Sequence, residues 1–218
     1  MKRTVLFILF LLQYITIYAQ DQDFDKKITI GVYSNIGINQ PIRLTRKYVT
    51  EDVGPFHGKS SWATGLKLSR MLTQKLRIEI VTGYTVHKVG FELSPPIYPV
   101  SKIYPETIRT FNIPINVHRY FINDFYLSLG TIADFEIPRK SYWIDSQNGI
   151  GFSIGAGKKF SLNNLVINIS PDLELHSVIP FHSVDNQQRL LVFEIKLGLS
   201  QCFGKREKED INPIISQN

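Results

Sequence analysis

The sequence predicts an all-β fold, an eight-stranded antiparallel up-and-down transmembrane β-barrel with short periplasmic turns and long external loops. Three observations support this prediction. Apolar and polar residues alternate with a period of two in eight segments, as they do in strands with one apolar face. These segments are about 10 to 13 residues long, whereas strands of soluble domains average about five to six and a tilted membrane-crossing strand needs about 9 to 11. The connections alternate between short and long.

The N-terminus has the layout of a secretory signal peptide. Lys2 and Arg3 precede an apolar run over residues 5–17, which ends at Tyr18, Ala19 and Gln20. The run is shorter than the roughly 20 residues that a membrane-spanning helix needs. We therefore expect a signal peptide over residues 1–19, a single barrel domain over 20–203 and a polar C-terminal tail over 204–218.

Composition excludes two classes of protein. Cys202 is the single cysteine, so an exported chain of this kind is not a disulfide-stapled scaffold. The formal charge of +6 is modest for 218 residues and the basic residues do not cluster, so a nucleic-acid partner is not expected. Lipid phosphates are the anionic partner that an exported chain would meet.

The first four strands are expected at residues 28–36, 62–72, 76–87 and 111–118. In residues 28–36 isoleucine and valine occupy even positions, and in 62–72 tryptophan and leucines do so. Even positions also hold the aliphatic and aromatic residues of 76–87, whereas odd positions hold those of 111–118. Each segment therefore presents one apolar and one polar face.

The last four strands are expected at residues 125–136, 150–157, 165–175 and 191–200. Apolar residues occupy odd positions in the first, third and fourth of these, and even positions in 150–157. The final segment is the clearest, because leucine, phenylalanine and isoleucine fill every second position from Leu191 to Leu199. It also resembles the C-terminal assembly signal of outer-membrane barrels, ending in the aromatic Phe203, although a polar tail follows.

Connection lengths orient the barrel. Residues 72–75, 122–124 and 161–164 are predicted to form tight turns, and residues 39–61, 92–107, 137–148 and 177–188 to form long loops. With the N-terminus in the periplasm, this order matches the periplasmic turns and external loops of outer-membrane barrels. A soluble sandwich has no reason to sort its loops in this way.

The polar faces carry charges and most of the strand glycines, whereas the opposite faces are almost purely apolar. A soluble lipocalin-like barrel would place apolar residues inside, around a small apolar ligand, and a membrane barrel reverses this. Charges and glycines on one face favour a narrow polar lumen filled by side chains. Aromatic residues at both ends of the segments, Phe91 among them, predict two interfacial girdles. Pro114 and Pro171 predict local bulges, since a closed barrel has no free edge.

Candidate site residues fall into two groups. The inward charges are expected to form an ionic network that plugs the lumen, because an eight-stranded barrel is too narrow for a solute channel. Its members are Lys67, Arg77, Glu79, Asp172, Glu174, Glu194 and Lys196. In the external loops, basic residues could pair with lipopolysaccharide phosphates and aromatic residues of a proline-rich segment could contact a protein. These candidates are Arg43, Arg46, Lys47, Tyr98 and Tyr104, with Lys59 also basic.

No catalytic or metal motif stands out. His176 lies beside Ser177, with Glu174 two residues earlier, so Glu174 and His176 should share a face from which Ser177 points away. That arrangement is poor for a proton relay. The other histidines lack metal-ligand spacing. We expect no enzyme activity, cofactor or metal. A lipid-modifying enzyme and a soluble ligand-carrying barrel are the alternatives.

Residues 111–117, Phe-Asn-Ile-Pro-Ile-Asn-Val, lead to Arg119, Tyr120 and Phe121. Together with eight long strands and a signal peptide ending at residues 18–20, they resemble the PorT-like family of outer-membrane β-barrel proteins. The resemblance implies the outer membrane of a Gram-negative bacterium as the location. One branch of the family is associated with protein secretion, but the resemblance implies location more than activity. We expect a non-enzymatic role, either structural or in contact with another envelope component.

Overall fold

The computed structural model describes residues 28–44, 53–93, 102–137, 145–162, 164–182 and 188–203. The expected signal peptide, the polar tail and the loop residues Arg46, Lys47 and Tyr98 lie outside these ranges. Among the described residues, no helix has the length and apolar character needed to cross a membrane.

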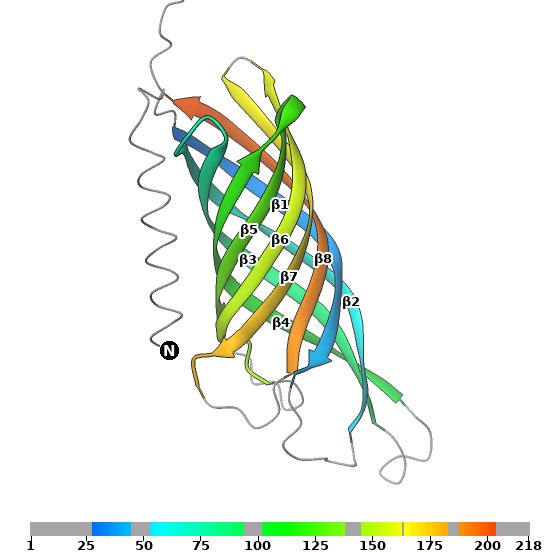
Figure 1. Ribbon diagram of the computed structural model, residues 1–218. Helices are drawn as coiled ribbons and strands as arrows, with labels where there is room; N and C mark the ends of the chain where they lie inside the picture. Colours follow the sequence, from blue (N-terminus) through cyan, green and yellow to red (C-terminus); the bar gives the residue numbers. More distant parts are fainter. Residues whose placement is uncertain are drawn as a thin grey trace, which may run out of the picture.

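Eight antiparallel strands form a closed barrel in which each strand pairs with its neighbours in sequence and β1 pairs with β8 (Figure 1). The strands are β1 (Ile28–Arg43), β2 (Val53–Met71), β3 (Leu76–Leu93), β4 (Lys102–Tyr120), β5 (Phe125–Glu136), β6 (Gly149–Leu162), β7 (Leu165–Pro180) and β8 (Gln188–Phe203). A short 3-10 helix, η1 (Ile122–Asp124), joins β4 to β5. The predicted fold class is confirmed.

The predicted tight turns lie together at one end of the barrel, which we call the turn end. The hydroxyl of Thr73 accepts a hydrogen bond from the backbone N–H of Leu76, which closes the β2–β3 turn. In η1, Asn123 has a positive φ of 58°, a conformation that asparagine tolerates better than most residues. We call the opposite end, to which the long connections belong, the loop end.

Seven of the eight strands extend further than the alternation predicted, and β2, β3 and β4 are the longest, with 19, 18 and 19 residues. Because β1 reaches Arg43 and β7 reaches Pro180, the predicted loop bounds 39–61, 92–107 and 177–188 are wrong. β4 pairs with β5 only from Thr110 onward, and β2 pairs with β1 only up to Ser60. The remaining parts of β2, β3 and β4 form a three-stranded extension beyond the rest of the barrel (Figure 1).

Bulges do not occur at the two prolines, contrary to the prediction. Pairing of β3 with β4 is interrupted beside Pro114 and resumes in the same register, and the β6–β7 pairing behaves alike beside Pro171. A local loss of one hydrogen bond therefore accommodates each proline. The register instead shifts at two places between β2 and β3 and once between β6 and β7, near Ser177, whose φ is 51°.

The barrel carries apolar side chains outward and polar side chains inward, as the alternation predicted. Ile36, Leu66 and Leu129 are 69%, 63% and 66% exposed. Polar side chains such as Asn35 and Glu194 are buried inside. The core of this molecule is therefore a polar lumen, and its outer surface is the apolar one.

Candidate functional site

The lumen at the turn end is occupied by Arg77, which is 4% exposed. Its guanidinium donates hydrogen bonds to the hydroxyl of Tyr120 at 3.2 Å and to the hydroxyl of Thr29 at 2.9 Å. The Thr29 hydroxyl is also hydrogen-bonded to that of Ser69. Hydroxyl groups from β1 and β4 thus hold Arg77, which makes no ion pair with another described residue.

One step further along the lumen, Glu79 lies between two nitrogen-bearing side chains. The Lys67 ammonium is 3.7 Å from Oε2 of Glu79, and Nε2 of His118 is 3.6 Å from Oε1. All three side chains are at most 6% exposed. They come from adjacent strands β2, β3 and β4, so the pleat alone brings them together.

The middle of the lumen holds the largest charge cluster. The Lys196 ammonium lies 2.8 Å from Asp172, 3.3 Å from Glu174 and 3.6 Å from Glu194. Asn35 donates a hydrogen bond of 2.5 Å to Glu194. Oxygens of the three carboxylates lie within 4.8 Å of one another, a spacing that could hold a metal ion. The Lys196 ammonium already contacts all three.

The seven predicted network residues are therefore divided. Lys67 and Glu79 form one cluster, Asp172, Glu174, Glu194 and Lys196 form a second, and Arg77 stands apart among hydroxyls. A small cavity separates the two clusters, with room on the order of one water molecule. The described lumen is filled by its own side chains at this level.

Asp134 is the centre of a third cluster that the sequence reasoning did not include in the network. It is fully buried, and Asn112 donates a hydrogen bond of 2.5 Å to its Oδ1. Nδ1 of His176 lies 3.0 Å from the same oxygen, and the backbone N–H of Ser177 donates to Oδ2 at 2.9 Å. In the sequence, the one feature that pointed to Asp134 was its charge on a strand face predicted to point inward.

The same cluster decides against a hydrolase relay. The irregular backbone near Ser177 brings its side chain inward beside His176, whereas simple alternation placed it on the opposite face. Its hydroxyl bonds to Asp134 and donates to the carbonyl of Gln147 at 2.7 Å. Nε2 of His176 faces Glu174 at 3.3 Å instead of the serine. A serine that is fully buried and not bonded to the histidine is not an activated nucleophile.

Near the loop end, the character of the interior changes. Val89, Ile108, Leu190 and Val192 pack into an apolar cluster, each at most 2% exposed, with Phe56 against it. Phe91 and Tyr104 stack there with their ring centroids 5.4 Å apart. Phe91 is 5% exposed, so its predicted place in the outer aromatic row is wrong.

On the outside of this region three of the exposed side chains are basic, and Ile103 is 49% exposed on the same face. Lys59, Lys88 and Arg109 lie on β2, β3 and β4 and are all exposed. Of the predicted loop contacts, Arg43 is exposed at the end of β1, whereas Tyr104 lies within β4 and is half-buried. The inside of the extension is thus mainly apolar and its outside carries three cations, in contrast to the barrel beneath it.

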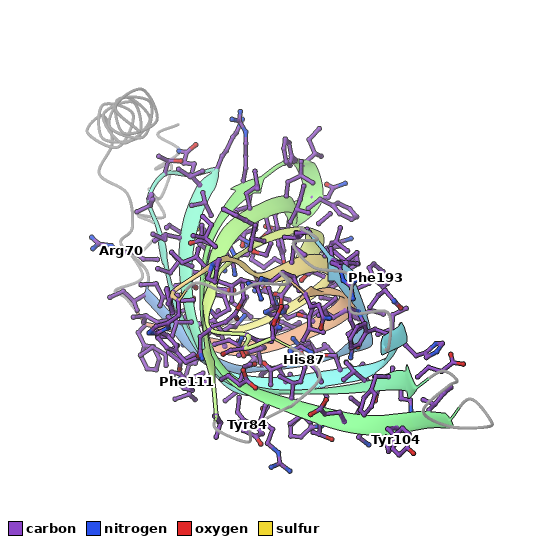
Figure 2. The ribbon with its side chains drawn as sticks, turned by 90° about the horizontal axis from the view of Figure 1, so that it is seen from below. Arg70, Tyr84, His87, Tyr104, Phe111 and Phe193 are labelled. Atoms are coloured by element: carbon purple, nitrogen blue, oxygen red, sulfur yellow. The ribbon has the colours of Figure 1, made fainter. Side chains whose placement is uncertain are left out.

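Aromatic side chains stand on the outer surface between these two regions. Trp62 and Tyr84 meet edge to face with ring centroids 6.0 Å apart, and Phe111 and Phe193 are about half exposed. Figure 2 shows Phe111 and Phe193 on the outer side of the ring of strands, with His87 inside it. At the turn end the Lys158 ammonium lies 4.8 Å from the Phe125 ring and 5.3 Å from that of Phe160.

Comparisons with known proteins support the fold. No family model and no curated protein matches the chain. It is similar to the crystal structure of the outer membrane protein OprG from Pseudomonas aeruginosa, with 12% identity, a TM-score of 0.50, and coverage of 83% of this chain and 97% of that one. It is also similar to the outer membrane protein AlkL in lipid bilayers, with 9% identity, a TM-score of 0.51, and coverage of 84% and 93%. At these identities the likeness shows the architecture alone.

Proposed function

We propose that the chain is a non-enzymatic outer-membrane β-barrel protein of a Gram-negative bacterium, exported by a signal peptide over residues 1–19. Its role is structural or lies in contact with another envelope component. The observation that carries the proposal is the reversal of polarity along the strands. The outer surface is apolar between the two aromatic rows and charged beyond them, which matches a lipid slab bounded by water.

The height of the apolar surface fits a membrane. On β1 the outward apolar side chains run from Ile28 to Ile38. Ten steps of about 3.3 Å, tilted by about 40° from the barrel axis, span about 25 Å. This equals the apolar band of about 25 Å that outer-membrane barrels present to lipid.

The filled lumen argues against both alternative functions, a soluble carrier of a small apolar ligand and a lipid-modifying enzyme. A lipocalin-like carrier needs an apolar cavity, whereas here Lys67, Glu79 and Lys196 line a space of about one water molecule. The Asp134 cluster likewise gives Ser177 no relay for a lipid-modifying reaction. Such an interior stabilises the barrel, which leaves the outer surface as the place where recognition of another molecule would occur.

Contact with another envelope component would take place at the loop end. The extension of β2, β3 and β4 packs there through Phe56, Val89 and Ile108 against Leu190 and Val192 of β8. The sequence also predicts contacts in the external loops. These are contacts with lipopolysaccharide through Arg43, Arg46 and Lys47, and a contact with a protein through Tyr98. A secretion machine as partner rests on the resemblance to the PorT-like family.

Cell fractionation combined with a heat-modifiability gel tests this proposal. The protein should be found in the outer-membrane fraction, and its unboiled form should migrate differently from its boiled form in detergent, because a closed barrel resists unfolding. A protein that stays monodisperse without detergent and shows no shift on boiling would refute the membrane location.

A further inference from the structure

We propose that the outer face of the β2–β3–β4 extension binds the phosphate groups of an anionic lipid through Lys59, Lys88 and Arg109. The inference rests on the proposed membrane location, and it names the lipid headgroup as the component that this face contacts. It differs from the sequence prediction, which placed the lipid contacts mainly in the first loop. The three residues instead lie on adjacent strands.

The pairing register brings the three cations together. Lys59 lies in the register shift between the Gly58–Val89 and Ser61–His87 pairs, so it stands beside Lys88. Lys88 pairs with Thr107 and Val86 pairs with Arg109, so Lys88 and Arg109 are diagonal neighbours. Diagonal neighbours across an antiparallel pair are about 7–8 Å apart at their Cα atoms, within reach of long side chains.

Glycine geometry shows that Lys59 and Lys88 share a face. A Cβ atom at Gly90 would lie 3.5 Å from Cε of Lys59 and 3.7 Å from Cβ of His57. Gly90 is two residues from Lys88 on the same strand and therefore points to the same side. That side is the outer one, because Val89, which lies between Lys88 and Gly90, and Phe91, which follows Gly90, are buried on the inner side.

The positive charge on this face is balanced only in part by the described residues. None of the three cations forms an ion pair with a described residue. Glu92 is on the same face and contacts Nε2 of His57 at 3.2 Å, so three cations and one carboxylate leave this face net positive. Glu106 lies on the opposite, inner face, because it is two residues from Ile108, which points inward, and side chains two residues apart in a strand point to the same side. Three neighbouring cations of this kind favour an anion with several oxygens.

The depth of the cations matches that of lipid phosphates. Tyr84 and Phe111 pair across β3 and β4 in the outer aromatic row, which marks the membrane interface. Arg109 is two residues beyond Phe111, and Lys88 is four residues beyond Tyr84. At about 3.3 Å per residue and a tilt of about 40°, they lie about 5 and 10 Å past the aromatic row, within the headgroup region.

Continuity with the apolar surface selects a lipid over an acidic polypeptide. Trp62, directly below Lys59 on β2, is 42% exposed, and Leu66 below it is 63% exposed. A lipid can place its chains on this surface while its phosphates meet the cations above. An acidic protein segment would use the cations but leave the aromatic row without a role.

Lipid titration of the purified full chain in a neutral detergent tests the proposal. The probes are diphosphorylated lipid A and the same lipid without its phosphates, and native mass spectrometry gives the dissociation constants. The wild type should bind the phosphorylated lipid at least tenfold more tightly, since each cation near a membrane surface contributes about fivefold. The variant K59Q/K88Q/R109Q should lose this preference.

The matched control is R70Q/K75Q/R119Q, which removes three charges at the turn end and should keep the preference. Equal loss in both variants would overturn the proposal, because binding would follow net charge alone. Displacement of the lipid by millimolar inorganic phosphate would overturn it in favour of a free-phosphate site, and tighter binding of a polyglutamate peptide would do so in favour of an acidic protein.

Folding is checked separately by heat modifiability, and K88Q alone, at one exposed position, keeps the test valid if the triple variant misfolds. A several-fold loss in K88Q supports the proposal, and unchanged binding in K88Q opposes it. A wild-type protein that shows no heat-modifiable band would defeat the membrane proposal itself. A heat-modifiable wild type without phosphate preference would defeat only the lipid site.

Discussion

Replacement of Lys196 by methionine is expected to destabilise the barrel by about 3–5 kcal/mol, the usual cost of leaving buried charges without their partner. Its ammonium lies 2.8, 3.3 and 3.6 Å from the oxygens of Asp172, Glu174 and Glu194. At an effective dielectric constant of about 20, these attractions amount to about 16 kcal/mol. The carboxylates, within 4.8 Å of one another, repel by about 10 kcal/mol in total. The ammonium thus turns a repulsive cluster into a net attractive one.

Urea unfolding in lipid vesicles, followed by the heat-modifiable band, measures this loss. Glu194→Gln is the matched control, because it removes one negative charge at nearly constant shape and keeps an acceptor for Asn35. We expect this variant to be as stable as the wild type or more stable, since it lowers the repulsion. The reasoning is refuted if Lys196→Met unfolds like the wild type, or if Glu194→Gln costs as much as Lys196→Met.

Three further substitutions test the outer surface, the lumen packing and the buried cluster by the same unfolding assay. Leu66→Arg, at a position 63% exposed on the apolar surface, should cost about 2–4 kcal/mol in a bilayer, and Leu66→Ala should cost much less; equal costs would contradict the lipid contact. Gly83→Ala should cost about 1–3 kcal/mol, because the added Cβ would overlap the hydroxyl oxygen of Tyr33. Gly90→Ala is its control and should cost less, because the nearest atom, at 2.9 Å, is a side-chain methyl that can move. Asp134→Ala should cost about 3 kcal/mol or more, as it leaves buried donors without an acceptor; a variant as stable as the wild type would mean that this cluster does not stabilise the fold.

Alternation alone was sufficient to predict that there are eight strands and which face of each is apolar over most of its length, although not the ends of the strands or the faces of Phe91 and Ser177. The outward side chains of each strand form one continuous apolar surface, so every second residue has the same character and the period of two is kept along most of the strand. The bulge positions were not predictable in the same way. Pro114 and Pro171 each lack one donor, but the register continues past them, whereas the shift between β6 and β7 occurs near Ser177, which has no special local pattern.

The candidate site was predictable in part because β7 and β8 are direct neighbours. Asp172 pairs with Glu194, and Ser170 pairs with Lys196, so inward charges on these strands had to meet. Arg77 shows the limit of such reasoning, since its partners are the hydroxyls of Thr29 and Tyr120, which resemble any other strand residues in the sequence. Charge identifies one member of a contact, and only the register identifies the other.

The extension of β2, β3 and β4 was missed for a more general reason. On β3 the outward positions change from Tyr84 and Val86 to Lys88, while the inward positions change from His87 to Val89. The alternation continues, but its polarity reverses, and in the sequence this looks like the end of a strand. On β8 the interior changes in the same manner from Glu194 to Val192. The proposed membrane location gives the reversal on β3 a simple cause, which is that the surroundings of the outer face change from lipid to water while the strand continues. On this proposal, phase reversal of the alternation marks the membrane boundary within a strand, and it can be sought in the amino-acid sequence of any barrel of this kind.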